Sequence, residues 1–251
     1  MKRYIPVVIT LCALSLSAGS YAHEKGKRGT PLLKELKQLS LTAEQREEVK
    51  LILESARTSR GDFKEARREA RDTMSAIVQS ESWDADAAQQ AFLEHADSRK
   101  EAMLNRATLM HDVWQLLDSE QQQTLSQRMA DKSGERGERG GDREKKWDKL
   151  SHKLALTDEQ MSAIKSIETT FKSKQTAFRA QMQSLKQTER DIIQQSVFDL
   201  AAWESLYAEF EPVAMEQAVE HAYMRHQIFN QLTEEQQQRL SRLMRKGPRH
   251  S

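Results

Sequence analysis

The chain has 251 residues, with 39 Lys and Arg against 38 Asp and Glu, and only 9 Gly, 4 Pro and 1 Cys. A single Cys excludes an internal disulfide framework and any zinc site that needs two or more Cys ligands. The balanced charge argues against a nucleic-acid binder, which usually carries a strongly basic domain. A charge-dense chain that is poor in Gly and Pro is typical of long solvated helices, so we expect an all-α protein.

Residues 1–22 have the pattern of a signal peptide. Two basic residues follow Met1, an uncharged apolar stretch covers 4–16, and a small-x-small motif ends at Ala22. This order predicts cleavage before His23, and the apolar stretch is short for a retained membrane anchor, which is the alternative. Because the only Cys, Cys12, lies in this peptide, we expect the mature chain to have no thiol. Because the apolar stretch is removed with the peptide, we also expect no membrane span after cleavage.

The remainder of the chain repeats at an offset of 115 residues. Holding that offset without a gap pairs 32–131 with 147–246, and 26 of these 100 pairs are identical. A gapless match of this length predicts a tandem duplication. The segment between the copies has no apolar residue and is rich in Gly, which predicts a flexible charged linker. The predicted parts are a first unit 23–131, a linker 132–146, a second unit 147–246 and a tail 247–251.

Each copy is expected to form a helical hairpin. Apolar residues three and four apart make a heptad-like seam on a first helix of about 37 residues, roughly 55 Å long. A second long helix is predicted from Asp84 to about Leu117, and from Asp199 to about Leu232 in the second copy. Pro212 is expected to interrupt and kink this second helix. With a short helix before and after each pair, we predict two long and two short helices per copy.

Four short motifs mark predicted helix starts. Three times a Thr, and once an Asp, stands three residues before a Gln, which is the spacing of a capping box. Each box is worth about 1 kcal/mol, and one alone says only that a helix begins there. A pair of boxes in both copies is more specific. The motif residues are Leu41, Thr42, Gln45, Leu117, Gln121, Leu156, Thr157, Gln160, Leu232, Thr233 and Gln236.

Paired Leu-Thr-x-x-Gln motifs on a secreted, helical, polar chain resemble the Spy/CpxP family of bacterial periplasmic proteins. Trp83 with Asp84, and Phe198 with Asp199, resemble the aromatic-Asp pair that opens the later long helix of that family. The resemblance implies a periplasmic location and a curved, cradle-like antiparallel dimer of helical hairpins. Because a usual member has one copy, two arrangements stay open here: an intramolecular pseudo-dimer made by one chain, or a homodimer.

The resemblance also sets the functional hypotheses. The leading one is an ATP-independent chaperone that binds unfolded or misfolded clients on a basic, partly apolar concave surface and suppresses aggregation in envelope stress. One alternative is a negative regulator that docks on the periplasmic domain of a sensor histidine kinase. Another is a metal-responsive protein for zinc or copper. Since the sequence has no phosphate-binding loop, nucleophile elbow or Cys nucleophile, we expect no enzymatic activity and no cofactor.

A basic stripe is the candidate client site. Five Lys and Arg residues of the first copy step by three and four along one helix, and three equivalent residues of the second copy are basic. The alternative is a solvated helix face with intrahelical partners. Aromatic residues at the hairpin tips either plug the turn or contact clients or the other copy. The candidates are Arg57, Arg60, Phe63, Lys64, Arg67, Arg71, Trp83, Lys172, Phe178, Arg179, Lys186 and Phe198.

Histidine gives only a weak hint of metal binding. His111 and His226 are the two His residues at equivalent positions of the copies, and no two His residues have the spacing of a helical ligand pair. We therefore expect no specific metal site, and these two side chains are its weak candidates.

Overall fold

The structure, a computed structural model, is all-α in the part that it describes, so the predicted fold class is confirmed. No helix among the described residues is long and apolar enough to cross a bilayer. The predicted signal peptide lies outside this part of the chain. The described residues are 36, 38–58, 60–138 and 150–245, and side chains are described in all of them except 56–64, 130–138 and 244–245.

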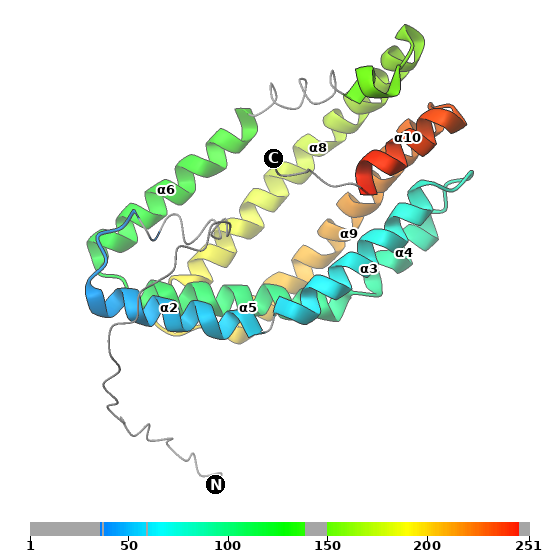
Figure 1. The fold of residues 1–251 in the computed structure, drawn as a ribbon. Coiled ribbons are helices and arrows are strands. Elements are labelled where there is room, and N and C mark those ends of the chain that lie inside the picture. The colour runs from blue at the N-terminus through cyan, green and yellow to red at the C-terminus, as the bar shows by residue number, and fades with distance from the viewer. Residues whose placement is uncertain (1–35, 37, 59, 139–149, 246–251) are drawn as a thin grey trace, which may run out of the picture.

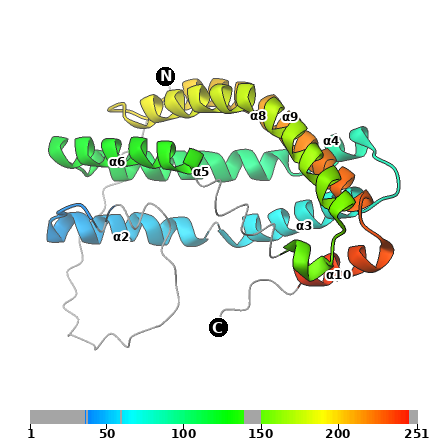
Figure 2. The same ribbon diagram turned by 90° about the horizontal axis from the view of Figure 1, so that it is seen from above.

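The second copy forms one long hairpin, in which the antiparallel α8 and α9 lie side by side (Figure 1). The predicted seam of α8 is buried at Ile164, Phe171, Leu185 and Ile192, and the Asp199 side chain caps α9 by accepting from the Ala202 N–H. Figure 2 shows that this hairpin bends along its length. The elements are α8 Asp158–Ile193, α9 Leu200–Asn230 and α10 Glu234–Arg245.

The structure has α9 running through Pro212 as one helix, so the predicted interruption is wrong, whereas the predicted kink at this residue stays a prediction. Proline removes one intrahelical hydrogen bond, which disfavours a helix interior. However, α9 has buried residues on both sides of the proline. Leu206 and Tyr207 precede it, and Val213 and Ala222 follow it. Tertiary packing therefore holds the helix together across the missing bond.

The second long helix of the first copy is broken into two helices, whereas the equivalent helix of the second copy is continuous. In the first copy this helix, predicted as one, ends at Leu93 and starts again at Ala96, so that prediction is wrong. Arg99 donates to the Phe92 carbonyl at 2.7 Å, and its guanidinium lies 3.6 Å from the centre of the Phe92 ring. A side chain thus takes the place of a helical donor at the break. The elements are α2 Ala43–Thr58, α3 Arg60–Val78, α4 Ala85–Leu93, α5 Ala96–Gln115 and α6 Ser119–Glu138.

The helix α6 also changes a predicted boundary. It continues to Glu138, so the first part of the segment 132–146, predicted as a flexible linker, is helical. The remainder of that segment lies outside the described residues.

The two hairpins cross, and apolar clusters lie at the crossing and at the two open ends (Figures 1 and 2). At the open end of the first copy, Leu41, Val49 and Leu117 share one cluster. Leu154 and Leu232 lie in the corresponding cluster of the second copy. The crossing cluster, as we name it, joins α5 of the first copy to α8 and α9 of the second. It consists of Ala107, Leu185, Ile192, Ile193, Trp203, Leu206, Tyr207 and Val213.

A strained residue precedes α8. Residues 150–154 are helical, and Ala155 follows with φ of 50°. The Leu156 N–H donates to the Ser151 carbonyl at 3.1 Å, and the Ala155 N–H donates to the His152 carbonyl at 3.3 Å. This pair of bonds is a Schellman motif, whose left-handed position normally carries Gly. A residue with a Cβ costs about 1–2 kcal/mol in that conformation.

Replacing Ala155 by Gly is therefore expected to raise the free energy of unfolding by about 0.5–1 kcal/mol, after the added entropy of the unfolded chain is subtracted. Urea unfolding followed by circular dichroism measures it. The control is Ser40→Gly at the equivalent position of the first copy, which has no positive φ and should gain nothing. Equal effects of the two substitutions would contradict the prediction.

Candidate functional site

All four predicted capping boxes are present. In the first, Gln45 Oε1 accepts from the Thr42 N–H at 2.9 Å, and Thr42 Oγ1 accepts from the Gln45 N–H at 3.2 Å. The other three make the same two bonds. The carboxylates of Glu44 and Glu159 accept from their own backbone N–H groups and from the cap hydroxyls, which lowers their pKa below the usual value. The helix starts thus follow from local sequence.

The same glutamines also bind each other across the open end of the hairpin. Gln45 Nε2 donates to Gln121 Oε1 at 2.9 Å, and Gln121 Nε2 donates back to Gln45 Oε1 at 3.0 Å. The second hydrogen of each amide goes to a backbone carbonyl, that of Leu116 at 2.7 Å or of Ser40 at 3.1 Å. Every donor and acceptor of both amides is used. We name this pair a glutamine clasp.

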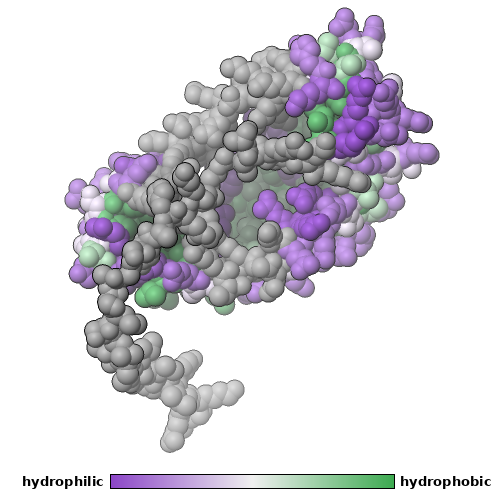
Figure 3. Space-filling model, viewed as in Figure 1, coloured by the Kyte–Doolittle hydropathy of each residue, from purple (hydrophilic) through white to green (hydrophobic). Residues whose placement is uncertain are grey.

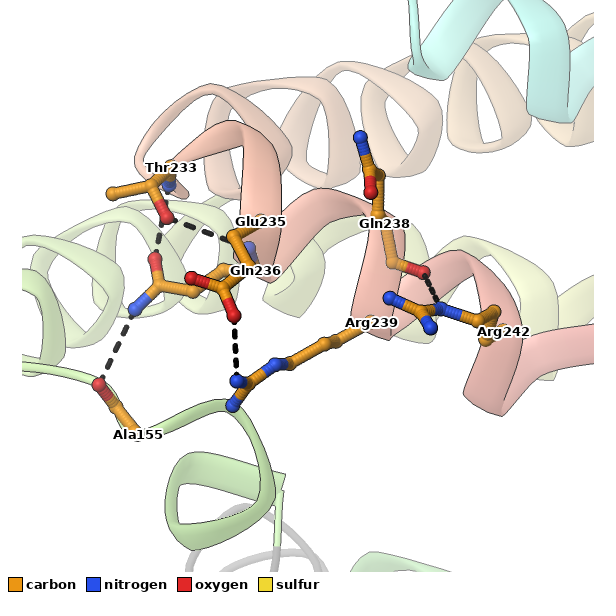
Figure 4. Close-up of polar contacts among 7 residues, drawn as sticks. All are labelled: Ala155, Thr233, Glu235, Gln236, Gln238, Arg239 and Arg242. Atoms are coloured by element: carbon orange, nitrogen blue, oxygen red, sulfur yellow. Dashed lines mark hydrogen bonds and ion pairs between the residues drawn. The ribbon is translucent and has the colours of Figure 1, made fainter.

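The second copy has an equivalent clasp. Gln160 and Gln236 exchange bonds of 2.8 and 3.0 Å. Their other hydrogens go to the carbonyls of Gln231 at 2.8 Å and Ala155 at 3.3 Å. Figure 4 shows the Gln236 amide between Thr233 and the Ala155 carbonyl. We did not predict the clasps. Their signal was the choice of Gln in all four boxes, because Glu can serve a capping box but cannot donate onward.

Two histidines join the copies. His111 Nδ1 lies 2.9 Å from the Ile193 carbonyl oxygen, and His226 Nδ1 lies 3.3 Å from that of Val78. Since a carbonyl only accepts, each Nδ1 carries the proton. Val78 and Ile193 are the last residues of α3 and α8, where carbonyls lack an intrahelical donor. Each copy therefore caps a helix of the other. On His226, Nε2 accepts from Asn230 Nδ2 at 3.0 Å.

The aromatic residues at the hairpin tips lie against these histidines. The Phe198 ring is 5.6 Å from that of His111. Trp83 is 5.5 Å from His226 and 5.3 Å from Tyr223. Of the roles considered for the tip aromatics, contact with the other copy is thus realised. Both rings stay half-exposed.

Two polar contacts between the copies use residues that are equivalent under the 115-residue offset. Gln194 Nε2 donates to Ser126 Oγ at 3.3 Å, and Ser241 Oγ donates to Gln79 Oε1 at 3.4 Å. Residues 126 and 241, like 79 and 194, are 115 positions apart. Each tip therefore lies on the other copy through equivalent residues.

At the crossing itself the contacts differ between the copies. The Tyr207 hydroxyl donates to Glu211 at 3.1 Å and lies 3.4 Å from the Ala96 carbonyl oxygen. Burial, and then the Glu211 carboxylate, raise the pKa of this hydroxyl. Lys100 pairs with Glu204 at 3.1 Å, which adds an exposed ion pair between the copies.

The weak metal candidates do not fit a metal site. Each Nδ1 of His111 and His226 is occupied by a carbonyl, and Asn230 holds the second nitrogen of His226. In the part of the chain that the structure describes, no three His, Cys, Asp or Glu residues are grouped to hold an ion.

The basic stripe is partly described. The side chains of Arg57, Arg60, Phe63 and Lys64 lie outside the description. Arg71 is 3.7 Å from Asp72, which is one intrahelical partner. Phe178 is half-buried against the crossing cluster. Their role in binding clients stays a prediction. The exposed cations of the stripe are Arg67, Arg71, Lys172, Arg179 and Lys186.

The fold and these contacts define a protein of two crossed helical hairpins, each closed by a glutamine clasp. Residues 142–244 match the LTXXQ motif family, and residues 7–124 match a family described as heavy-metal resistance. Both families are members of the Spy/CpxP-like group. No curated protein and no solved structure matches the chain.

The clasp predicts a specific effect of Gln121→Glu. The carboxylate cannot donate, so the Ser40 carbonyl and Gln45 Oε1 each lose a donor and face a negative charge. Because Gln121 is buried, the carboxylate that replaces its amide loses both contacts away from water, and the free energy of unfolding should fall by about 1–3 kcal/mol. Urea unfolding at neutral pH measures the loss.

The control is Gln123→Glu, which puts the same charge at an exposed position on the same helix. It should change stability little. Since a protonated carboxyl can donate, the loss in the Gln121 variant should shrink as the pH falls through the raised pKa of the new Glu. Equal losses for the two substitutions would show that the clasp does not stabilise the fold.

Proposed function

We propose that the protein is a periplasmic, ATP-independent chaperone that binds unfolding clients and suppresses their aggregation. The matches of residues 7–124 and 142–244 to two families of the Spy/CpxP-like group support this. The observation that carries it is a row of exposed cations along α3 and α8. Within the described residues, Arg67, Lys172 and Lys186 have no ion pair within 4.0 Å. Unpaired cations on a rigid helix attract acidic clients over a distance and speed encounter.

Exposed apolar groups supply the holding contacts. Figure 3 shows green residues recessed in the middle of this face of the molecule, with purple residues beside them. At the turn between α8 and α9, Val197 is 75% and Leu200 49% exposed. Residues 195–200 line a hollow of about 580 Å³. Apolar segments of a client gain free energy when they cover such groups.

We further infer that one chain forms the whole cradle. The reciprocal contacts of His111 and His226 use both tips within one molecule, which leaves neither for a second chain. Small-angle scattering with light scattering should therefore give the mass of one mature chain at micromolar concentration. A mass of two chains would favour the homodimer instead.

The charge row predicts a loss of client capture on charge reversal. Lys172→Glu with Lys186→Glu should delay capture of a denatured client, and the delay should be larger at low salt because screening is weaker there. The measurement is light scattering of a client diluted from denaturant, without nucleotide.

The matched control is Arg106→Glu with Lys153→Glu, two exposed cations away from the stripe that give the same net charge. It should keep normal activity. If the wild-type protein, in several-fold excess, suppresses no aggregation, the proposed function is wrong. If both double variants behave alike, the stripe is not the client site.

A further inference from the structure

The two tips lie on the other copy through unequal joints. In the second copy, Leu185, Trp203 and Leu206 are buried in the crossing cluster. The equivalent positions of the first copy carry Ala70, Ala88 and Ala91. We name the first the tryptophan joint and the second the alanine joint. In the alanine joint α3 and α4 pack on α9, and Ala88 and Ala91 are 0% and 5% exposed.

The alanine joint is therefore closed but weakly held. A buried Trp removes about 150–250 Å² of surface from water, far more than a methyl group does. Hydrophobic stabilisation is proportional to that apolar area. The helical break at Glu94 and His95 also separates α4 from α5, whereas α9 is continuous at the equivalent positions. At these three positions the alanine joint therefore buries less apolar side-chain area than the tryptophan joint, and α4 is not held by a continuous helix to α5.

A half-buried cation is next in sequence to the histidine that contacts α3 in this joint. Arg225 holds the position that Met110 has in the first copy, where Met110 packs on the crossing cluster. It directly precedes His226, which caps Val78. Arg225 is half-buried, and burial lowers the pKa of its guanidinium. Within the described part of the chain no ion pair involves it. Keeping an unpaired cation from water costs free energy, which exposure of the guanidinium would recover.

We propose that α3 and α4 detach from α9 together, and that the uncovered surface of Trp83, Tyr223 and Arg225 binds an unfolded segment in which aromatic or aliphatic side chains neighbour a carboxylate. This inference rests on the proposed chaperone function. It specifies the class of client that is bound and the helices that move to bind it. The opened Trp83 and Tyr223 rings offer apolar faces, and a client carboxylate gives the guanidinium the partner that it lacks in the closed form. Trp, Tyr and Arg are the residues that most often dominate binding energy at interfaces.

Matched cross-links test the opening. Gln79→Cys with Ser241→Cys spans the alanine joint, and Ser126→Cys with Gln194→Cys spans the tryptophan joint at the equivalent positions. Both are made in a Cys12→Ser background, which removes the one native thiol. After bridging with a short bismaleimide, the alanine-joint variant should need about tenfold more protein to suppress aggregation, since it loses at least one charge-assisted contact. The tryptophan-joint variant should act as before bridging.

The unbridged proteins separate the two ideas. If they do not suppress aggregation, the chaperone function itself fails. If they do, and the two bridges have equal effects or only the tryptophan-joint bridge inactivates, the chaperone function stands and the opening of α3 and α4 is wrong.

A second test uses Arg225→Met, which installs the residue of the first copy, with Arg225→Lys as the charge-keeping control. Amide hydrogen exchange in α4 should slow in the Met variant, because closure no longer buries a cation. Its affinity for a synthetic peptide of Asp and Phe should fall about tenfold, which is the loss of one hydrogen-bonded charge pair. The Lys variant should bind the peptide, and the same peptide with Asn for Asp should bind all three proteins weakly. Faster exchange with unchanged binding in the Met variant would make Arg225 a packing residue and overturn the proposal.

Discussion

The glutamine clasp is the interaction on which the rest of this structure depends. Long helices with a thin seam define their mutual register poorly, because polar residues interrupt the seam at Lys174, Gln181 and Thr188. The clasp ties two helix starts and two loop carbonyls into one network with no free donor or acceptor. A helix of this length carries any error at its base some 50 Å to its tip. Fixing the base of each hairpin therefore fixes the position of the carbonyl at its tip, which the histidine of the other copy contacts.

Local patterns predicted the parts of the fold that local chemistry controls. The capping boxes and the buried seam at Ile164, Phe171 and Leu185 follow from spacing alone. The clasps do not, because they form between residues 76 positions apart. Burial on both sides overrode the local cost of Pro212, and the break before Ala96 depends on tertiary contacts that spacing does not reveal. Among the candidate site residues, exposure was predictable for the cations, and the partners of the tip aromatics were not.

The two tips differ in the residues that pack behind their contacts. The residues that cap the other copy are kept in both, as His111 with Ile193 and His226 with Val78. The apolar residues behind them differ, with Trp203 in one tip and Ala88 in the other. Two identical chains would carry the same residues in both joints. A single chain is free of that constraint, so one joint can serve stability while the other serves binding.

The reciprocal His–carbonyl contacts are self-complementary, so identical contacts could equally join a tip to a neighbouring molecule. The covalent link between the copies decides this competition, because it holds each tip near its partner at an effective concentration in the millimolar range. Closure within one chain then persists on dilution, where an assembly of separate single-copy units would dissociate. The peptide connection thus makes the contact between the two hairpins independent of the protein concentration.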